Sequence, residues 1–174
     1  MARGPAATGD RAHASFTELR SDLGWLLSEA LRGYVTAATG AVADIPGGLR
    51  GYHLLAAVAV DACSSQLKLA EGLRVDRTVM THLIDGLEAQ RLVERRPDPA
   101  DRRARRVLIT EKGRRVLDTC GARLRKVRAE LLAPLADEEQ RLLVDVLARV
   151  GARVEPGTAD LSELCQGQGG DPAC

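Results

Sequence analysis

The sequence predicts a mainly α-helical fold that carries one small β-hairpin. Apolar residues recur at helical spacing along most of the chain, and one arginine-rich segment mixes branched apolar and charged residues as half-exposed strands do. Hydrophobic residues make up 45% of the sequence but aromatic residues only 2%, so we expect a core of leucine, valine and alanine. Such a core favours packed helices, and a length of 174 residues allows one domain or a compact pair.

Two helices are expected in the N-terminal part. Residues 1–14 are small and polar and are expected to be disordered. The first helix must end before the turn-forming run Ile45-Pro46-Gly47-Gly48, and the second runs from Leu49 to Val60. Helical spacing in the first helix relates Phe16, Leu19, Leu23, Leu26, Leu27, Ala30 and Leu31.

Two short helices with a tight connection follow, and together they predict a helix-turn-helix. A serine-capped helix covers residues 64–73, and Asp76 stands at the N-cap position of the next helix, where its carboxylate suits the helix dipole. The inner stripe of this second helix is formed by Met80, Leu83, Ile84 and Leu87. Its other face carries side chains that can hydrogen-bond in a major groove, namely Arg77, Thr78, Thr81, His82 and Asp85.

A charged hairpin comes next. Residues 92–96 and 106–110 have strand-like patterns, and residues 97–105 between them have no apolar side chain larger than alanine or proline to bury. Their arginines suit phosphate oxygens and a narrow minor groove. A helix-turn-helix followed by such a hairpin is a winged helix-turn-helix, which predicts binding to double-stranded DNA. The alternative is a solvated hairpin whose arginines pair with Asp98 and Asp101.

Two more helices are expected after the hairpin. Thr110 can cap a helix from Glu111 towards Leu132, and Asp137 can cap the last one. That last helix bears the apolar residues Leu142, Leu143, Val146, Leu147 and Val150.

The helices at the two ends lack obvious partners within one small winged helix, so a second copy is the economical way to bury their apolar stripes. We therefore expect a homodimer whose two recognition helices lie about 34–36 Å apart, in successive major grooves. The expected parts are dimerisation helices at 15–48 and 111–154, a DNA-binding domain at 49–110, and a flexible acidic tail at 155–174.

Charge is distributed unevenly along the chain. The formal net charge is only +1, but residues 91–128 hold 14 basic and 5 acidic side chains, whereas residues 129–174 hold 3 and 9. A strongly basic block inside a nearly neutral protein is typical of a phosphate-binding surface.

Several linked blocks of this region resemble a known family. They read LIDGLE at 83–88, LVERRP at 92–97, DRR at 101–103 and VLITEKG at 107–113, and they resemble the signature of MarR-family transcriptional regulators. The resemblance is tight over residues 67–115 and looser over 16–154. It implies a homodimeric winged-helix protein that binds pseudo-palindromic operators, mostly as a repressor. It also implies that DNA release follows binding of a small phenolic or aromatic ligand, or cysteine oxidation, as in many members.

The resemblance assigns roles to the hairpin arginines. Arg103 would enter the minor groove with Asp101 as its orienting partner, while Arg102 and Arg105 would contact phosphates. The complete set of expected DNA contacts is Ser64, Ser65, Gln66, Arg77, Thr78, Thr81, His82, Arg95, Asp101, Arg102, Arg103 and Arg105. Family ligand pockets lie between the dimerisation helices and the winged helix. The candidate lining residues are therefore Trp25, Tyr52 and His53, with a core or interface position as the alternative for each.

Other functions have less support in the sequence. A cysteine-based redox sensor stays an alternative, although Cys63 and Cys120 are most simply small buried residues and Cys165 and Cys174 lie in the tail without metal spacing. The three histidines, at 13, 53 and 82, form no zinc cluster. A winged helix used only for protein–protein interaction is the other alternative, but it would not need the hairpin arginines.

Neither catalysis nor a membrane location is expected. The sequence has no glycine-rich phosphate loop and no Gly-x-Ser-x-Gly elbow, so we expect no enzyme activity and no cofactor. The longest apolar run, residues 54–60, is much shorter than the roughly 20 residues that span a bilayer. With no visible signal peptide, a cytoplasmic protein is expected.

Overall fold

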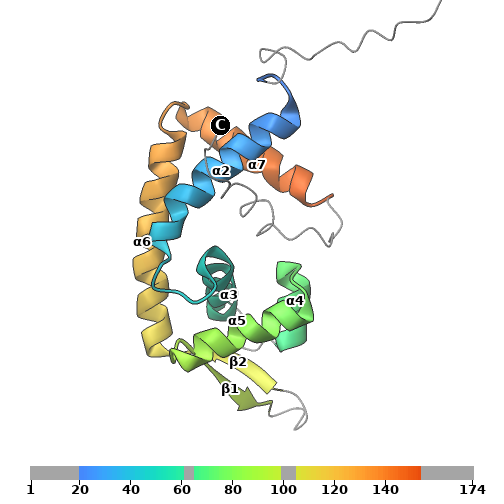
Figure 1. Cartoon of the computed structure of the whole chain (residues 1–174), viewed down its shortest axis with the longest axis vertical. Helices are drawn as coiled ribbons and strands as arrows, with labels where there is room; N and C mark the ends of the chain where they lie inside the picture. The colour runs from blue at the N-terminus through green and yellow to red at the C-terminus, as the bar shows by residue number, and fades with distance from the viewer. Residues whose placement is uncertain (1–19, 61–64, 99–104, 154–174) are drawn as a thin grey trace, which may run out of the picture.

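A computed structural model describes residues 20–60, 65–98 and 105–153. Within these residues the chain forms six helices and one antiparallel hairpin, in the order α2 (Leu23–Ala41), α3 (Gly48–Val60), α4 (Gln66–Leu73), α5 (Arg77–Ala89), β1 (Val93–Pro97), β2 (Arg105–Ile109), α6 (Glu111–Leu132) and α7 (Asp137–Gly151). The predicted mainly α fold with a small hairpin is confirmed. Figure 1 shows the long α6 running along the molecule, with α3, α4, α5 and the hairpin at one end and α2 and α7 at the other.

Side chains cap most of these helices at their N-termini. Asp22 accepts a hydrogen bond from the amide of Trp25 at 2.9 Å and so fixes the start of α2 at Leu23. Thr110 caps α6, as predicted, by accepting from the amide of Gly113 at 3.0 Å. Phe16 and Leu19, which were expected in the first helix, lie outside the described residues.

Several predicted boundaries are wrong by one residue. β1 covers Val93–Pro97 rather than 92–96, because the amide of Leu92 donates to the carbonyl of Leu87 and Leu92 belongs to the turn that ends α5. β2 covers Arg105–Ile109 rather than 106–110, and α3 begins at Gly48 rather than at Leu49. Asp137 is not the cap of the last helix. The cap is Ala136, whose amide donates to the Glu139 carboxylate at 2.8 Å.

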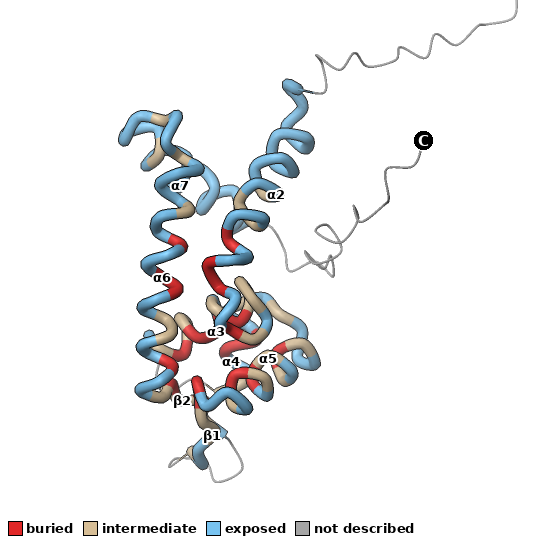
Figure 2. Tube along the Cα trace, turned by 60° about the vertical axis from the view of Figure 1, so that its left-hand side comes forward, coloured by how far each residue is buried: buried red, intermediate tan, exposed pale blue. Residues whose placement is uncertain are grey.

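The hydrophobic core lies in the part that contains the hairpin (Figure 2). It is built from α3, α5, the two strands and one face of α6. Its largest fully buried side chains are Val42, Leu54, Leu55, Val58, Met80, Ile84, Leu87, Leu92, Val93, Val107 and Cys120. Gly113 permits the close approach of α6 to the hairpin, since a Cβ there would collide with the carbonyl oxygen of Leu92. The C-terminal end of α2 joins this core through Ala38 and Ala41.

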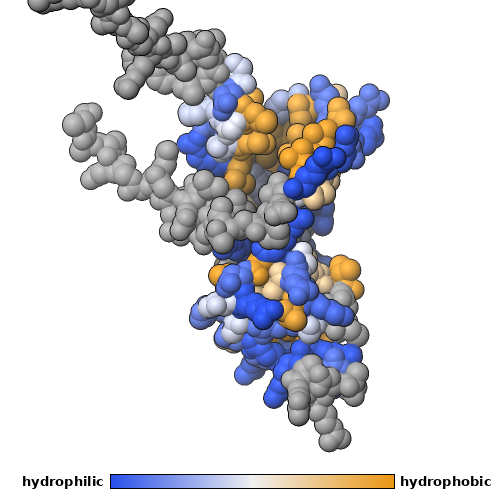
Figure 3. All heavy atoms as spheres, turned by 90° about the vertical axis from the view of Figure 1, so that its right-hand side faces the viewer, coloured by the Kyte–Doolittle hydropathy of each residue, from blue (hydrophilic) through white to orange (hydrophobic). Residues whose placement is uncertain are grey.

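The other end of the molecule exposes apolar surface. No residue of α7 is buried, and large apolar side chains of α2 and α7 face solvent, namely Leu23, Trp25, Leu26, Leu27, Leu142, Leu143, Val144, Val146, Leu147 and Val150. Figure 3 shows hydrophobic residues gathered on this part of the surface. One contact returns from α7 to the core end, where the Arg74 guanidinium donates to the carbonyl of Gly151 at 3.1 Å.

Candidate nucleic-acid interface

Helix α5 has a buried inner face and a solvent-facing outer face. The carboxylate of Asp76 accepts hydrogen bonds from the amides of Thr78 at 2.7 Å and Val79 at 3.4 Å, which confirms its predicted N-cap role. These bonds, that to Thr78 first, lower the pKa of Asp76 below its usual value, so the carboxylate stays charged at the N-terminus of the helix. On the outer face, Arg77 and His82 are exposed.

Helix α4 is held against α5 by a polar contact. The side-chain amide nitrogen (Nε2) of Gln66 donates to the Thr81 hydroxyl at 2.6 Å, and that hydroxyl donates in turn to the backbone carbonyl of Arg77 at 2.9 Å. Ser65 caps α4 by accepting from the amide of Lys68 at 3.3 Å. Gln66 and Thr81 therefore face one another at the junction of the two helices. Ser64 lies outside the described residues.

The hairpin projects beyond α5 at the end of the molecule (Figure 1). Its register pairs Val93 with Ile109 at the base and Pro97 with Arg105 at the outer end, and Arg105 is exposed there. Arg106 forms a two-pronged ion pair with Asp98, at 2.7 and 2.8 Å. Asp98 is thus paired with a hairpin arginine, as the solvated-hairpin alternative predicts. Asp101, Arg102 and Arg103 lie outside the described residues.

Arg95 does not stand free on the hairpin. Its guanidinium contacts the carboxylates of Asp85 and Glu88, both on α5. The sequence predicts Arg95 as a DNA contact and Asp85 on the DNA-facing side of the helix. It does not predict that these two residues pair. Their separation of ten residues, across a helix end and a turn, gives no local pattern that would have revealed the pair.

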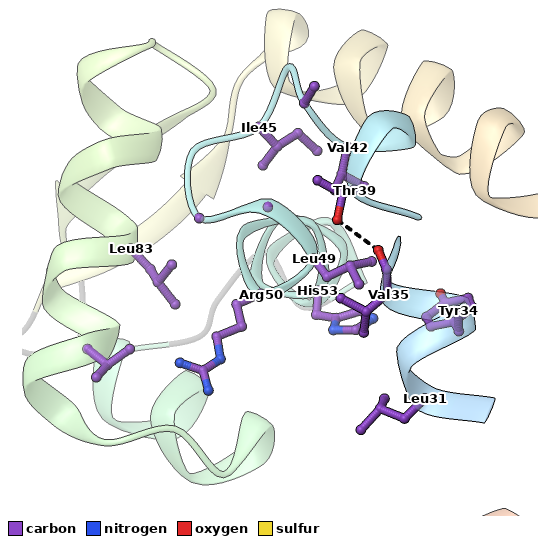
Figure 4. A pocket seen from close by; sticks show the side chains of 14 residues that line it. Leu31, Tyr34, Val35, Thr39, Val42, Ile45, Leu49, Arg50, His53 and Leu83 are labelled. Carbon is purple, nitrogen blue, oxygen red and sulfur yellow. Dashed lines mark hydrogen bonds between the residues drawn. The ribbon is translucent and has the colours of Figure 1, made fainter. Parts of the chain in front are cut away.

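A cavity of about 670 Å³ lies behind α5. It is bounded by α2, α3 and the inner face of α5, and Figure 4 shows Leu31 of α2 and Leu83 of α5 on opposite sides of it, with Arg50 reaching in from α3. The full lining is Leu31, Tyr34, Val35, Thr39, Val42, Ala43, Ile45, Gly47, Gly48, Leu49, Arg50, His53, Val79 and Leu83. The walls are mostly aliphatic, with a few polar groups among them.

Of the three predicted ligand residues, the structure places one at this cavity. His53 lines it, and partial desolvation lowers the pKa of His53 below its usual value. Tyr52 is not among the lining residues and packs edge-on against the His53 ring, with centroids 5.8 Å apart. Trp25 lies nearer the start of α2 and is 43% exposed. Arg50, which was missed, lies one turn before His53 on α3, a spacing that could have drawn attention to it.

The cysteines and the candidate metal ligands complete the set of residues considered in the sequence analysis. Cys120 on α6 is fully buried, as predicted, and burial raises the pKa of its thiol. Cys63, Cys165 and Cys174 lie outside the described residues. Across the three described segments, no cluster of histidine, cysteine and acidic side chains could hold a metal ion. No helix among those residues is both long and apolar enough to cross a membrane.

Comparison with known proteins agrees with this geometry. Residues 51–104, which run from α3 into the hairpin, match the model of the MarR family. The structure of CouR from Rhodococcus jostii RHA1 bound to p-coumaroyl-CoA is similar at 28% identity and a TM-score of 0.69, with 79% of this chain and 96% of that chain covered.

Two further structures are similar to the same extent. PcaV, a transcriptional regulator from Streptomyces coelicolor in complex with its natural ligand, has 25% identity and a TM-score of 0.70 over 79% of this chain and 96% of its own. A MarR-family transcriptional regulator from Rhodococcus sp. RHA1 has 26% identity and a TM-score of 0.70 over 78% and 98%. These similarities confirm the winged helix-turn-helix fold and extend it over most of the chain.

Proposed function

We propose that this chain, whose residues 51–104 match the model of the MarR family, is a ligand-responsive transcriptional regulator, acting as a repressor, that binds a pseudo-palindromic operator as a homodimer. One observation carries the proposal. The outer face of α5 and the basic hairpin lie side by side, tied by Arg95, at an end of the molecule that has no further element beyond it among the described residues. A major-groove reader and a minor-groove reader occupy those places in a winged helix.

The residues of α5 supply the major-groove half of this proposal. Arg77, Thr78 and His82 are exposed on the outer face and offer donors and acceptors to base edges and phosphates. Thr81 completes the proposed set from the junction with α4, where Gln66 holds its hydroxyl. The hairpin supplies the minor-groove half through Arg103, with phosphate contacts on either side of it.

Homodimerisation is supported by the apolar faces of α2 and α7. Large contiguous apolar surface on a small chain marks an interaction site, and a two-fold axis through these helices would bring two copies of α5 to one side of the DNA. At a separation of about 34–36 Å they would fill successive major grooves.

Binding to DNA is tested with a duplex that carries the promoter beside the protein's own gene. Fluorescence anisotropy is measured across a series of salt concentrations, with a scrambled duplex of the same length as control. We expect tight binding to the promoter duplex, weaker binding to the scrambled one, and a steep fall of log affinity with log salt, because phosphate contacts release counterions. Equal failure on both duplexes at low salt would contradict the proposal and favour an interaction module.

Ligand response is supported by the cavity behind α5. Its volume falls in the range of sites for small organic molecules. A small aromatic or phenolic effector seated there would touch Val79 and Leu83, which belong to the inner side of the helix proposed to enter the major groove. A ligand that prefers one placement of α5 would shift the DNA-binding equilibrium by its difference in affinity.

The effector is sought with a panel of phenolic and aromatic acids, read by thermal shift and by release of the labelled operator. The substitution Val35→Phe fills the cavity from α2 and is expected to abolish the response while leaving operator binding intact. Leu67→Phe, on the exposed side of α4, is the matched control and should keep the response. A hit whose effect survives Val35→Phe binds elsewhere.

A further inference from the structure

Arg95 lies on strand β1, but its side chain pairs with carboxylates of α5, the proposed recognition helix. One guanidinium nitrogen lies 2.5 Å from the Asp85 carboxylate and another contacts the Glu88 carboxylate. The backbone also takes part, because the amide of Arg95 donates to Glu88 at 2.9 Å. Three polar contacts therefore join β1 to α5, and all three involve Arg95.

The clamp formed by Arg95, Asp85 and Glu88 is unlike the other arginine contacts on the strand. The Arg95 side chain is 22% exposed, whereas that of the next residue, Arg96, is 63% exposed and pairs within its own strand with Glu94. A forked guanidinium held by two carboxylates keeps a defined direction. To reach a phosphate, Arg95 would have to give up both partners.

The position of the clamp determines what it can control. It lies midway along β1, between the buried base at Val93 and the outer end at Pro97, from which the hairpin tip continues. On the helix side, its carboxylates belong to the C-terminal half of α5, away from the N-terminal turn that holds Arg77. A link at this point fixes the angle between the hairpin and α5.

We propose that Arg95 is a positioning residue: the clamp sets the hairpin angle at which α5 and the hairpin tip reach adjacent grooves together, and Arg95 itself does not touch DNA. This inference rests on the proposed DNA-binding function. It replaces the expectation, drawn from the sequence, that Arg95 is one of the DNA contacts.

The direction in which one substitution changes DNA affinity distinguishes a positioning role from a simple effect of charge. Glu88 and Glu94 are both carboxylates of the DNA-binding end, so removal of either one alone reduces repulsion from a polyanion and should raise affinity slightly. Positioning makes the opposite prediction for Glu88, because its loss frees the hairpin. Within the residues that the structure describes, Glu94 pairs with Arg96 and is outside the clamp, so it is the matched control.

The test compares Glu88→Ala with Glu94→Ala for binding to the promoter duplex and to the scrambled duplex. We expect Glu88→Ala to weaken promoter binding by about tenfold, equivalent to about 1.4 kcal/mol, and to reduce the preference over the scrambled duplex. Glu94→Ala should bind as tightly as the unsubstituted protein or more tightly. If Glu88→Ala binds the promoter as well as Glu94→Ala does, the clamp does not position the hairpin.

Salt dependence tests the role of Arg95 itself. Arg95→Met should lower affinity at every salt concentration without changing the slope of log affinity against log salt. A slope reduced by about 0.9 for each copy of the arginine removed would identify a lost phosphate contact and overturn the proposal. The double variant Arg95→Met with Asp85→Ala should be no weaker than Arg95→Met alone, since Asp85 bonds the guanidinium of Arg95 and both substitutions break that one contact.

Amide hydrogen exchange supplies a measurement that needs no DNA. Glu88→Ala should accelerate exchange at Arg95 and along β1 relative to Glu94→Ala, whereas equal exchange in the two variants would overturn the clamp. If the unsubstituted protein binds neither duplex, the proposed function fails, and this comparison still decides whether Glu88 fixes the hairpin.

Discussion

The apolar face of α7 gives a prediction whose size follows from the structure. Leu147 is 46% exposed in the single chain, and no residue of α7 is buried. Truncating this side chain therefore removes little from the fold of one copy. If α7 packs against a second copy, the same truncation removes a contact of the dimer, so Leu147→Ala separates dimerisation from folding.

The magnitude comes from the area still open to solvent. Complete burial of a leucine side chain stabilises by about 1.5–3 kcal/mol, so burying the exposed half of Leu147 contributes about 1 kcal/mol. A two-fold dimer contains two copies and loses about 2 kcal/mol, which raises the dimer dissociation constant about 30-fold. A monomer holds only one recognition helix. Operator binding should therefore weaken when the protein is diluted below the dimer dissociation constant.

Sedimentation velocity over a dilution series measures the dissociation constant directly. Leu67→Ala is the matched control, because Leu67 is 45% exposed but belongs to α4 in the DNA-binding part. We expect the control to sediment as the unsubstituted protein does. A dissociation constant equal in the two variants, or an unsubstituted protein that is monomeric at micromolar concentration, would refute dimerisation through α7.

Three further predictions concern the hairpin, the thiols and pH. Arg103→Ala should weaken operator binding in anisotropy measurements while sedimentation shows an intact dimer, and unchanged affinity at physiological salt would remove the hairpin from the mechanism. Mild peroxide should change operator affinity little, because the one described thiol, Cys120, is buried and its pKa is raised; a large loss rescued by dithiothreitol would establish a redox switch. Since the folded state lowers the pKa of His53 from an ordinary value of 6.5, the unfolded chain binds the extra proton more readily. Thermal stability should therefore fall as pH drops below that value, and His53→Gln should flatten this part of the profile.

Local features were predictable from the sequence, because their partners are near in the chain. Asp76 and Thr110 cap the helices that follow them, and each bond spans only two or three residues. Apolar spacing likewise predicted the inner stripe of α5, where Met80 and Ile84 are fully buried. In such cases the helix geometry alone decides which side chains meet.

Contacts across a turn were not predictable in the same way. The pairing of Arg95 with Asp85 depends on how sharply the chain reverses after α5, where Arg91 adopts a positive φ of 58°. An arginine in a basic hairpin resembles a phosphate contact by residue type, and only the fold reveals that its charge is already engaged. For Trp25, aromatic character suggested a ligand site, whereas the structure places this residue near the start of α2 and not in the cavity lining.

The arrangement of α5 makes the two proposed activities thermodynamically linked. Val79 lines the cavity from the inner side of this helix, while Thr78, the preceding residue, lies on the outer side proposed to face DNA. A rigid helix cannot shift one side without the other, so a ligand that fits only one placement of α5 changes the affinity for the operator. Linkage then requires the operator to change the affinity for that ligand by the same factor. Titrating the ligand with and without bound operator duplex therefore measures the coupling from the opposite direction, and equal ligand affinities in the two titrations would place the cavity outside the regulatory mechanism.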